Sequence, residues 1–126
     1  MSDKSQARHL FQTIYYGHVD QGDMDTAVMA FHPDVEWSHA QVWAHHGFAR
    51  GEPTQLHGRD SVHAFLAARV AELKDAGITH HVREMVMEGD KGAFIGAVEG
   101  PGPDRAFMVW FEVKDKLVSR YVLRPL

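Results

Sequence analysis

The pattern of hydrophobic and polar positions divides the chain into a helix-rich first half and a strand-rich second half. Between residues 5 and 19, apolar side chains return every three or four positions, which is typical of a helix with one buried face. Asp23 has the position of an N-cap for a short second helix, and Pro33 is expected to end that helix. Tyr16 lies about 100° round the first helix from its neighbour, so we expect it at a surface or interface. The inward positions of the first helix are Leu10, Phe11, Ile14, Tyr15, His18 and Val19.

A strand and a long loop are predicted next. Residues 34–40 alternate in polarity, which places Val35, Trp37 and His39 together on one inward face. Residues 41–58 are rich in glycine and show no periodicity. A loop of this length is uncommon unless it covers something, so we expect it to lie over a pocket.

The rest of the chain returns to helical spacing and then alternates. Residues 59–75 predict a third helix, which Gly77 ends. Glycine-containing or charged turns separate the following four strands, so neighbouring strands are expected to pair antiparallel. These strands are residues 78–88, 92–99, 105–113 and 117–123. The order predicts one α+β domain over residues 1–126, with three helices packed on a strongly curved antiparallel sheet that encloses an apolar cavity.

The two faces of this sheet carry different side chains. Phe107, Val109 and Phe111 share one face and are expected to line the cavity. Met108 and Trp110 lie on the other face together with charged residues. Large apolar side chains on an outer sheet face favour a protein interface, so we expect a homodimer formed through that face.

Composition and charge exclude several classes of function. The chain has 126 residues and a net charge of −4, which argues against a nucleic-acid-binding protein. It has no cysteine, so disulfides, thiolate metal sites and a cysteine nucleophile are excluded. No apolar run is long enough to span a membrane, and the first residues lack the apolar core of a signal peptide. The expected location is the cytoplasm.

His39 is the sharpest candidate for chemistry. Its imidazole would lie beside Trp37 in an apolar wall, where desolvation favours the neutral base form. The alternative is a buried structural histidine with a satisfied hydrogen bond. Tyr15 could polarise a substrate carbonyl, or it could be an aromatic core residue. Trp43 lies in the long loop, where a pocket mouth would need an apolar side chain.

A metal site is the tempting alternative for the histidine-rich stretch. His39, His45 and His46 fall within eight positions, and zinc accepts three histidines. Their spacing matches no standard motif, however, and adjacent side chains in an extended segment point apart. The pair His80-His81 meets the same objection. We therefore predict no metal and no cofactor.

The segments GDMDTAVMAFHPDVEW at 22–37 and LHGRDSVHAFLAARV at 56–70 resemble the NTF2-like superfamily, and within it the SnoaL-like and ketosteroid-isomerase-like proteins. The resemblance covers nearly the whole chain. It implies that Tyr15 has the position of the tyrosine that donates a hydrogen bond to the enolate oxygen. It implies that His39 has the position of the general base, where the isomerases have aspartate. Val109 falls near the second oxyanion donor, so that carboxylic acid is missing.

These observations favour a cofactor-independent proton transfer, isomerase- or cyclase-like, on a small hydrophobic carbonyl compound. Val35 and Trp37 would line its pocket along with Trp43, Phe107, Val109 and Phe111. Two alternatives stay open. One is a non-catalytic protein that binds a small ligand in the same pocket. The other is a dehydratase or epoxide hydrolase of the same fold, although the Asp-Arg-Asp set of such hydrolases cannot be located.

Overall fold

The computed structural model describes residues 3–40, 52–69, 77–102 and 104–126. The chain begins with one continuous helix made of α1 (Asp3–Arg8), a π-helical segment η1 (His9–Tyr16) and α2 (Gly17–Gln21). Gly22 ends this helix in the left-handed conformation, with φ of 80°, and its amide bonds the carbonyls of His18 and Val19. The predicted first helix is therefore confirmed.

The π-helical segment changes which side chains face the sheet. A π-helix has i→i+5 hydrogen bonds and more residues per turn than an α-helix, so residues five apart lie closer to the same face. Leu10 and Phe11 are buried, and so are Tyr15 and Tyr16 one π-turn later. Tyr16 is only 2% exposed, so the prediction that it reaches a surface is wrong. That prediction assumed the tighter α-helical repeat, which would have rotated Tyr16 away from the core.

The second helix is short and starts as predicted. Asp23 caps α3 (Met24–Ala27), since its Oδ1 accepts a hydrogen bond from the Thr26 amide at 3.1 Å. A 3₁₀ turn, η2 (Val28–Ala30), follows, and β1 (Phe31–His39) begins directly afterwards. Pro33 therefore lies inside a strand and does not end the helix, contrary to the prediction. Strand β1 tolerates Pro33 because its pairing with β6 shifts register between Phe31 and Glu36. No regular strand-to-strand hydrogen bond is therefore required from the Pro33 nitrogen, which has no proton to donate.

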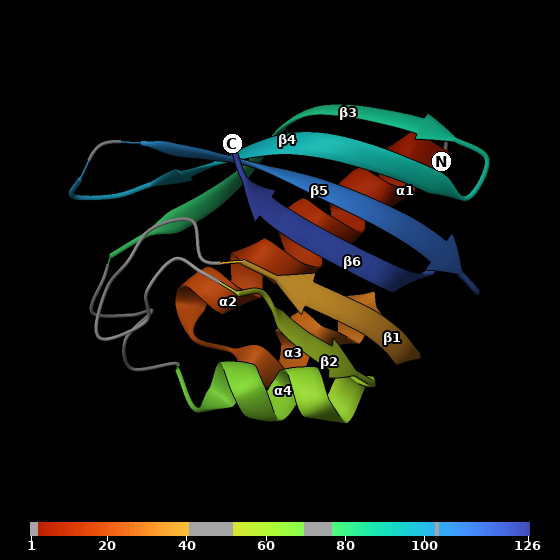
Figure 1. The fold of residues 1–126 in the computed structure, drawn as a ribbon, viewed down its shortest axis with the longest axis horizontal. Helices are drawn as coiled ribbons and strands as arrows, with labels where there is room; N and C mark the ends of the chain where they lie inside the picture. Colours follow the sequence, from red (N-terminus) through yellow and green to blue (C-terminus); the bar gives the residue numbers. More distant parts are fainter. Residues whose placement is uncertain (1–2, 41–51, 70–76, 103) are drawn as a thin grey trace.

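The described residues form a six-stranded, strongly curved sheet with the order β2-β1-β6-β5-β4-β3 (Figure 1). Strands β3 to β6 pair antiparallel in sequence order, as predicted, whereas β1 pairs parallel to β6. The segment predicted to be an irregular loop contains β2, which pairs antiparallel with β1. The strand bounds are β2 Thr54–His57, β3 Thr79–Glu88, β4 Lys91–Glu99, β5 Arg105–Lys114 and β6 Leu117–Pro125.

The helices cover one face of this sheet, which is the cone-like α+β arrangement expected from the sequence (Figure 1). Phe107, Val109 and Phe111 are fully buried on the covered face. Glycines on β4 make room for the rings. A Cβ on Gly96 would lie 2.4 Å from the Phe107 ring, and one on Gly92 would lie 2.6 Å from the Phe111 ring. The core thus depends on small residues in β4 and large ones in β5.

The third predicted helix is α4 (Arg59–Ala67), which buries Val62 and Leu66. It is shorter than predicted, because the chain forms a turn at residues 68–69. Helix α4 packs against β1 and β2 at the end of the sheet far from β3 (Figure 1). Among the described residues, no helix combines the length and the apolar character needed to cross a membrane.

Candidate active site

His39 lies at the end of β1 and remains partly exposed. Its ring stacks on Trp37, with centroids 5.2 Å apart and an interplanar angle of 4°. Desolvation lowers the pKa of His39 to about 3, and the positive charge of Arg69 acts in the same direction. His39 is therefore neutral at pH 7, as the sequence suggested. The same low pKa makes it a weak proton acceptor.

Three tyrosines from two elements meet beside Trp37. Tyr15 and Tyr16 come from η1, Tyr121 from β6, and all three are at most 3% exposed. The hydroxyls of Tyr16 and Tyr121 share a hydrogen bond of 2.8 Å, and the rings of Tyr15 and Tyr121 meet edge to face at 5.6 Å. Burial raises the pKa of each of the three phenols well above its ordinary value. They stay protonated and can donate hydrogen bonds.

Trp37 brings an unsatisfied donor to the same place. Its ring is 2% exposed and stacks on Tyr121 at 5.9 Å. The indole Nε1–H lies close enough to oppose the rise in the pKa of Tyr15, yet it makes no complete hydrogen bond to any described residue. A buried unpaired N–H costs about 1–3 kcal/mol. Such a donor is a natural position for an acceptor atom of a ligand.

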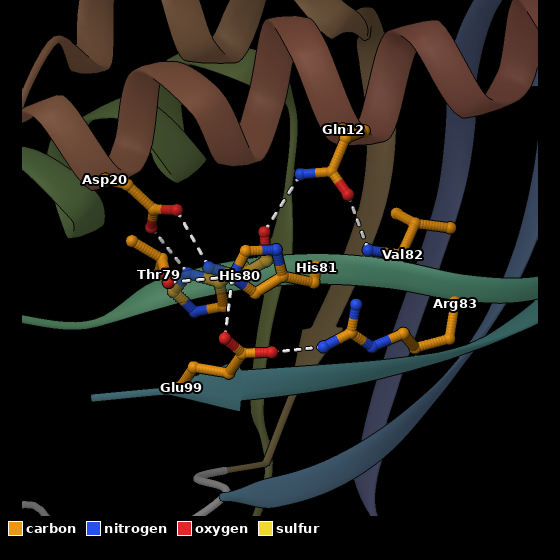
Figure 2. Close-up of polar contacts among 8 residues, drawn as sticks. All are labelled: Gln12, Asp20, Thr79, His80, His81, Val82, Arg83 and Glu99. Carbon is orange, nitrogen blue, oxygen red and sulfur yellow. Dashed lines mark hydrogen bonds and ion pairs between the residues drawn. The ribbon is translucent and has the colours of Figure 1, made fainter. Parts of the chain in front are cut away.

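An aspartate and a histidine form a partly buried pair between the first helix and β3 (Figure 2). Asp20 lies in the last turn of α2, and His80 lies near the start of β3. One carboxylate oxygen of Asp20 accepts a hydrogen bond from the His80 backbone amide at 2.8 Å. The other oxygen lies 2.6 Å from Nδ1 of the His80 ring. The two side chains are only 12% and 15% exposed. The His80 ring also stacks on Tyr16, with centroids 5.1 Å apart.

This geometry sets the tautomer of His80. An ionised carboxylate accepts hydrogen bonds, so Nδ1 carries the proton and donates it to Asp20. The lone pair of the neutral ring is then on Nε2, and no described residue forms a hydrogen bond to that atom. A histidine held in this way is a competent general base.

Helix side chains also fix the edge strand that carries His80. The Gln12 amide nitrogen donates to the His80 carbonyl at 2.9 Å, and the Gln12 carbonyl oxygen accepts from the Val82 amide at 2.6 Å (Figure 2). Arg8 donates to the carbonyls of Val82 and Arg83 at 3.2 and 2.9 Å. Strand β3 ends the sheet, so its free backbone groups need such partners. The helix thereby sets the position of His80.

Arg69 is a buried cation near His39 and Tyr15. It is 7% exposed, and its guanidinium carbon lies 4.7 Å from the centre of the Phe65 ring. Phe65 in turn packs against Trp37 at 5.5 Å. The charge of Arg69 lowers the pKa of both Tyr15 and His39, so it acts on the same site. Buried charges are usually paired or functional.

The predicted site residues therefore divide into groups. His39, Trp37 and Tyr15 lie together. Their neighbours Asp20, His80 and Arg69 were not predicted as catalytic or pocket residues. Val35, Val109 and Phe111 are fully buried. Phe107 approaches the His80 ring at 6.4 Å, whereas Phe111 packs 4.9 Å from Phe11. Trp43, His45 and His46 lie outside the described residues.

Two hollows lined by described residues lie away from this site. One lies beside Asp3 and Met87, and another on the outer face beside Trp110. Within the described parts of the chain, no group of three or more histidines and carboxylates is arranged to hold a metal ion.

Comparisons with known proteins identify the relatives of this chain. The model of the family described as "SnoaL-like domain" matches residues 13–121. A candidate ketosteroid isomerase from Kribbella flavida is 16% identical with a TM-score of 0.67, and the match covers 97% of this chain and 78% of that one. A candidate polyketide cyclase from Sinorhizobium meliloti is 20% identical with a TM-score of 0.62, covering 88% and 90%. TerC, co-crystallized with polyporic acid, is 20% identical with a TM-score of 0.70, covering 96% and 92%. No curated protein matches the chain.

Proposed function

Because this chain belongs to the SnoaL-like domain family, we propose that it catalyses a cofactor-independent proton transfer on a small, largely apolar carbonyl compound, as an isomerase or a cyclase. The observation that carries the proposal is the partly buried Asp20–His80 pair beside three protonated tyrosines. Candidate isomerases and cyclases among the structural relatives support the class of reaction.

His80 is the base in this proposal, and Asp20 is its positioning residue. The Nε2 atom takes a proton from the carbon next to the substrate carbonyl, and the electron pair of that C–H bond moves to the carbonyl oxygen as an enolate. Asp20 keeps the proton on Nδ1 and stabilises the imidazolium that forms. If the substrate has a β,γ double bond, the imidazolium returns the proton to the γ-carbon while the carbonyl re-forms and the double bond moves into conjugation, which completes an isomerisation. If the enolate carbon instead attacks a second carbonyl of the same molecule, the imidazolium returns its proton to the alkoxide that forms, which completes a cyclisation.

The enolate oxygen needs hydrogen-bond donors placed in advance. Tyr15 is a neutral phenol with a raised pKa, so it donates a hydrogen bond without losing its proton. The unpaired Nε1–H of Trp37 is the second donor, and the positive charge of Arg69 favours an anion nearby. His39 keeps its place in the proposed site as a neutral imidazole against the substrate. Its pKa of about 3 is too low for it to be the main base.

The proposal is tested without a known substrate by hydrogen–deuterium exchange. A panel of small cyclic and aryl ketones is incubated with the protein in deuterated water, and loss of the α-proton signal is followed by NMR. We expect accelerated exchange for some members of the panel, and a reduction of about a hundredfold to ten-thousandfold in His80→Gln.

His81→Gln is the matched control. His81 is the next residue on β3, lies half exposed, and contacts Thr79 at 2.8 Å and Glu99 at 3.6 Å (Figure 2). This control should keep the wild-type rate. Equal exchange by wild type and His80→Gln would remove His80 from the mechanism. Binding of panel members without any exchange would favour the non-catalytic binding protein. Hydroxy ketones and epoxides are incubated in parallel, and loss of water or opening of the epoxide without α-proton exchange would favour the dehydratase or hydrolase alternative.

A further inference from the structure

Arg69 places a positive charge in the interior beside the proposed site. It lies just after α4, and its backbone amide donates to the Leu66 carbonyl at 3.0 Å in the turn that ends this helix. The residue is only 7% exposed, whereas arginine side chains usually keep their charged end in water. Removing the charge from water costs free energy. Such a position is typical of a charge that takes part in binding or in an ion pair.

Ring contacts join this guanidinium to the aromatic side chains of the site. Its central carbon lies 4.7 Å from the centre of the Phe65 ring, which is within the range of a cation–π contact. Phe65 packs against Trp37 at 5.5 Å, and Trp37 stacks on His39. A ring on one side limits how far the guanidinium can turn. Its planar set of donors is therefore oriented before a ligand arrives, which lowers the entropy lost on binding.

The contacts within the site form one series that runs from the proposed base to this cation. The His80 ring stacks on Tyr16, and the Tyr16 hydroxyl shares a hydrogen bond with that of Tyr121. Tyr121 stacks on Trp37 at 5.9 Å. The members of the series, in order of contact, are His80, Tyr16, Tyr121, Trp37, Phe65 and Arg69. A ligand that lies along these rings meets a base at one end, a cation at the other, and aromatic surface between them.

The electrostatics of the site agree with this arrangement. Burial raises the pKa of Tyr15 most, Asp20 raises it further, and Arg69 lowers it, so the Tyr15 hydroxyl lies in the field of both charges. The pKa of His39 is lowered to about 3, chiefly by desolvation and also by the charges of Arg69 and Arg124. Both arginines are permanent cations. The end of the site near His39 therefore has a positive potential, which favours an anionic ligand.

We propose that Arg69 binds a carboxylate of the substrate, so that the substrates are small keto acids with the carboxylate and the carbonyl at opposite ends of an apolar body. The inference rests on the proposed function, which places the carbonyl end at His80 and Tyr15. A planar guanidinium matches a carboxylate with two parallel N–H···O hydrogen bonds. Such charge-assisted bonds are stronger than neutral ones, and a low local dielectric strengthens them. Arg69 is then a specificity-determining residue, while the proton transfer stays at His80.

The first test compares ligands on the unaltered protein. The probes are benzoyl-substituted alkanoic acids of increasing chain length, each together with its methyl ester and its primary amide. Each acid joins an aryl ketone to a carboxylate through an apolar spacer, and the ester and amide keep the shape but lose the charge. Binding to the wild type is measured by isothermal titration calorimetry at neutral pH. We expect at least one acid to bind about tenfold to a hundredfold more tightly than its own ester and amide.

Variants then assign the preference for the acid to one side chain. Arg69→Gln removes the charge and should bind the acid and its ester with equal affinity, whereas Arg69→Lys keeps the charge without the planar set of donors and should retain a reduced preference. Arg124→Gln is the matched control, because Arg124 also acts on His39 but donates its hydrogen bonds to Ser38 and the Leu123 carbonyl. This control should keep the wild-type preference. Circular dichroism checks the folding of each variant, and if Arg69→Gln does not fold, Arg69→Lys and the ligand series decide the outcome.

Three outcomes would overturn the carboxylate site. The first is a wild type that binds no acid of the series more tightly than its ester. The second is a folded Arg69→Gln that keeps the full preference. The third is a variant that slows α-proton exchange of acid and ester alike without changing the affinity for either, since Arg69 would then act only on the enolate. The proposed catalysis fails separately, because binding of an acid that depends on Arg69, without any exchange, would refute the proton transfer and keep the carboxylate site.

Discussion

The low pKa of His39 makes a quantitative prediction about stability. In the unfolded chain a histidine has a pKa near 6.5, whereas desolvation beside Trp37 lowers the folded pKa to about 3. The unfolded state therefore takes up a proton as the pH falls below 6.5, while the folded state does not. It follows that the stability due to the neutral ring is fully present above pH 6.5. It is lost progressively as the pH falls toward 3.

The size of the effect follows from proton linkage. One proton bound only by the unfolded state changes the free energy of unfolding by about 1.4 kcal/mol per pH unit. Integration from pH 7 to pH 5 gives a loss of about 2 kcal/mol from His39 alone. The variant His39→Gln has no proton to take up at this position. Its free energy of unfolding should therefore fall by about 2 kcal/mol less than that of the wild type over the same range.

Urea unfolding of both proteins at several pH values between 7 and 5, followed by circular dichroism, measures the difference. All other titrating groups are common to the two proteins, so their contributions cancel in the comparison. His9→Gln is a control, because His9 is exposed on the first helix. It should follow the wild-type curve. Parallel curves for wild type and His39→Gln would refute the reasoning, since they would mean that His39 titrates as a solvated histidine.

Three further variants test the packing and the caps. Gly96→Ala would place a Cβ 2.4 Å from the Phe107 ring and should cost about 1–3 kcal/mol in thermal or urea unfolding, whereas Gly102→Ala meets nothing within 4 Å and should be nearly neutral. Asp23→Ala should cost about 1 kcal/mol through loss of the helix cap, and an unchanged melting temperature would argue against that cap. Gln12→Ala leaves two backbone groups of β3 without their hydrogen-bond partners and should lower the free energy of unfolding by about 1–3 kcal/mol. Faster amide exchange should be confined to the start of β3, and exchange unchanged there would argue against this contact.

The sequence predicted the elements whose physics is local. Alternation along β5 correctly separated Phe107 from Met108, because the period of a strand places successive side chains on opposite faces. The cap at Asp23 was correct because it needs only a side-chain oxygen three residues before an amide. The four-strand meander followed from similar local rules.

The sequence could not predict features that depend on distant parts of the chain. Tyr16 was misplaced because a π-helical segment shows no separate signature in an apolar pattern that also fits an α-helix. Strand β2 was missed because four residues with intermediate and exposed side chains gain their structure only by pairing with β1.

The dyad was missed for a related reason. His80 and Asp20 are 60 residues apart and meet only because the edge strand β3 packs beneath the first helix. The available signal was an acid in the last turn of one inward helix and a histidine opening a strand. In the sequence, the adjacent pair His80-His81 suggests only metal ligands. Arg69 gave no signal at all, since it lies over Phe65, which in turn packs against Trp37.

The central claim is that His80, positioned by Asp20 in a partly buried pair, transfers the proton. The chain offers its own control, because Asp25 and His63 form the same kind of contact at 2.6 Å on the exposed surface. The most direct measurement is the rate of ketone α-proton exchange catalysed by Asp20→Asn and by Asp25→Asn, with both proteins shown to be folded. We predict that Asp20→Asn loses at least about a hundredfold in rate, since the amide no longer fixes the tautomer of His80, and that Asp25→Asn keeps the wild-type rate. Equal rates for the two folded variants would contradict the claim.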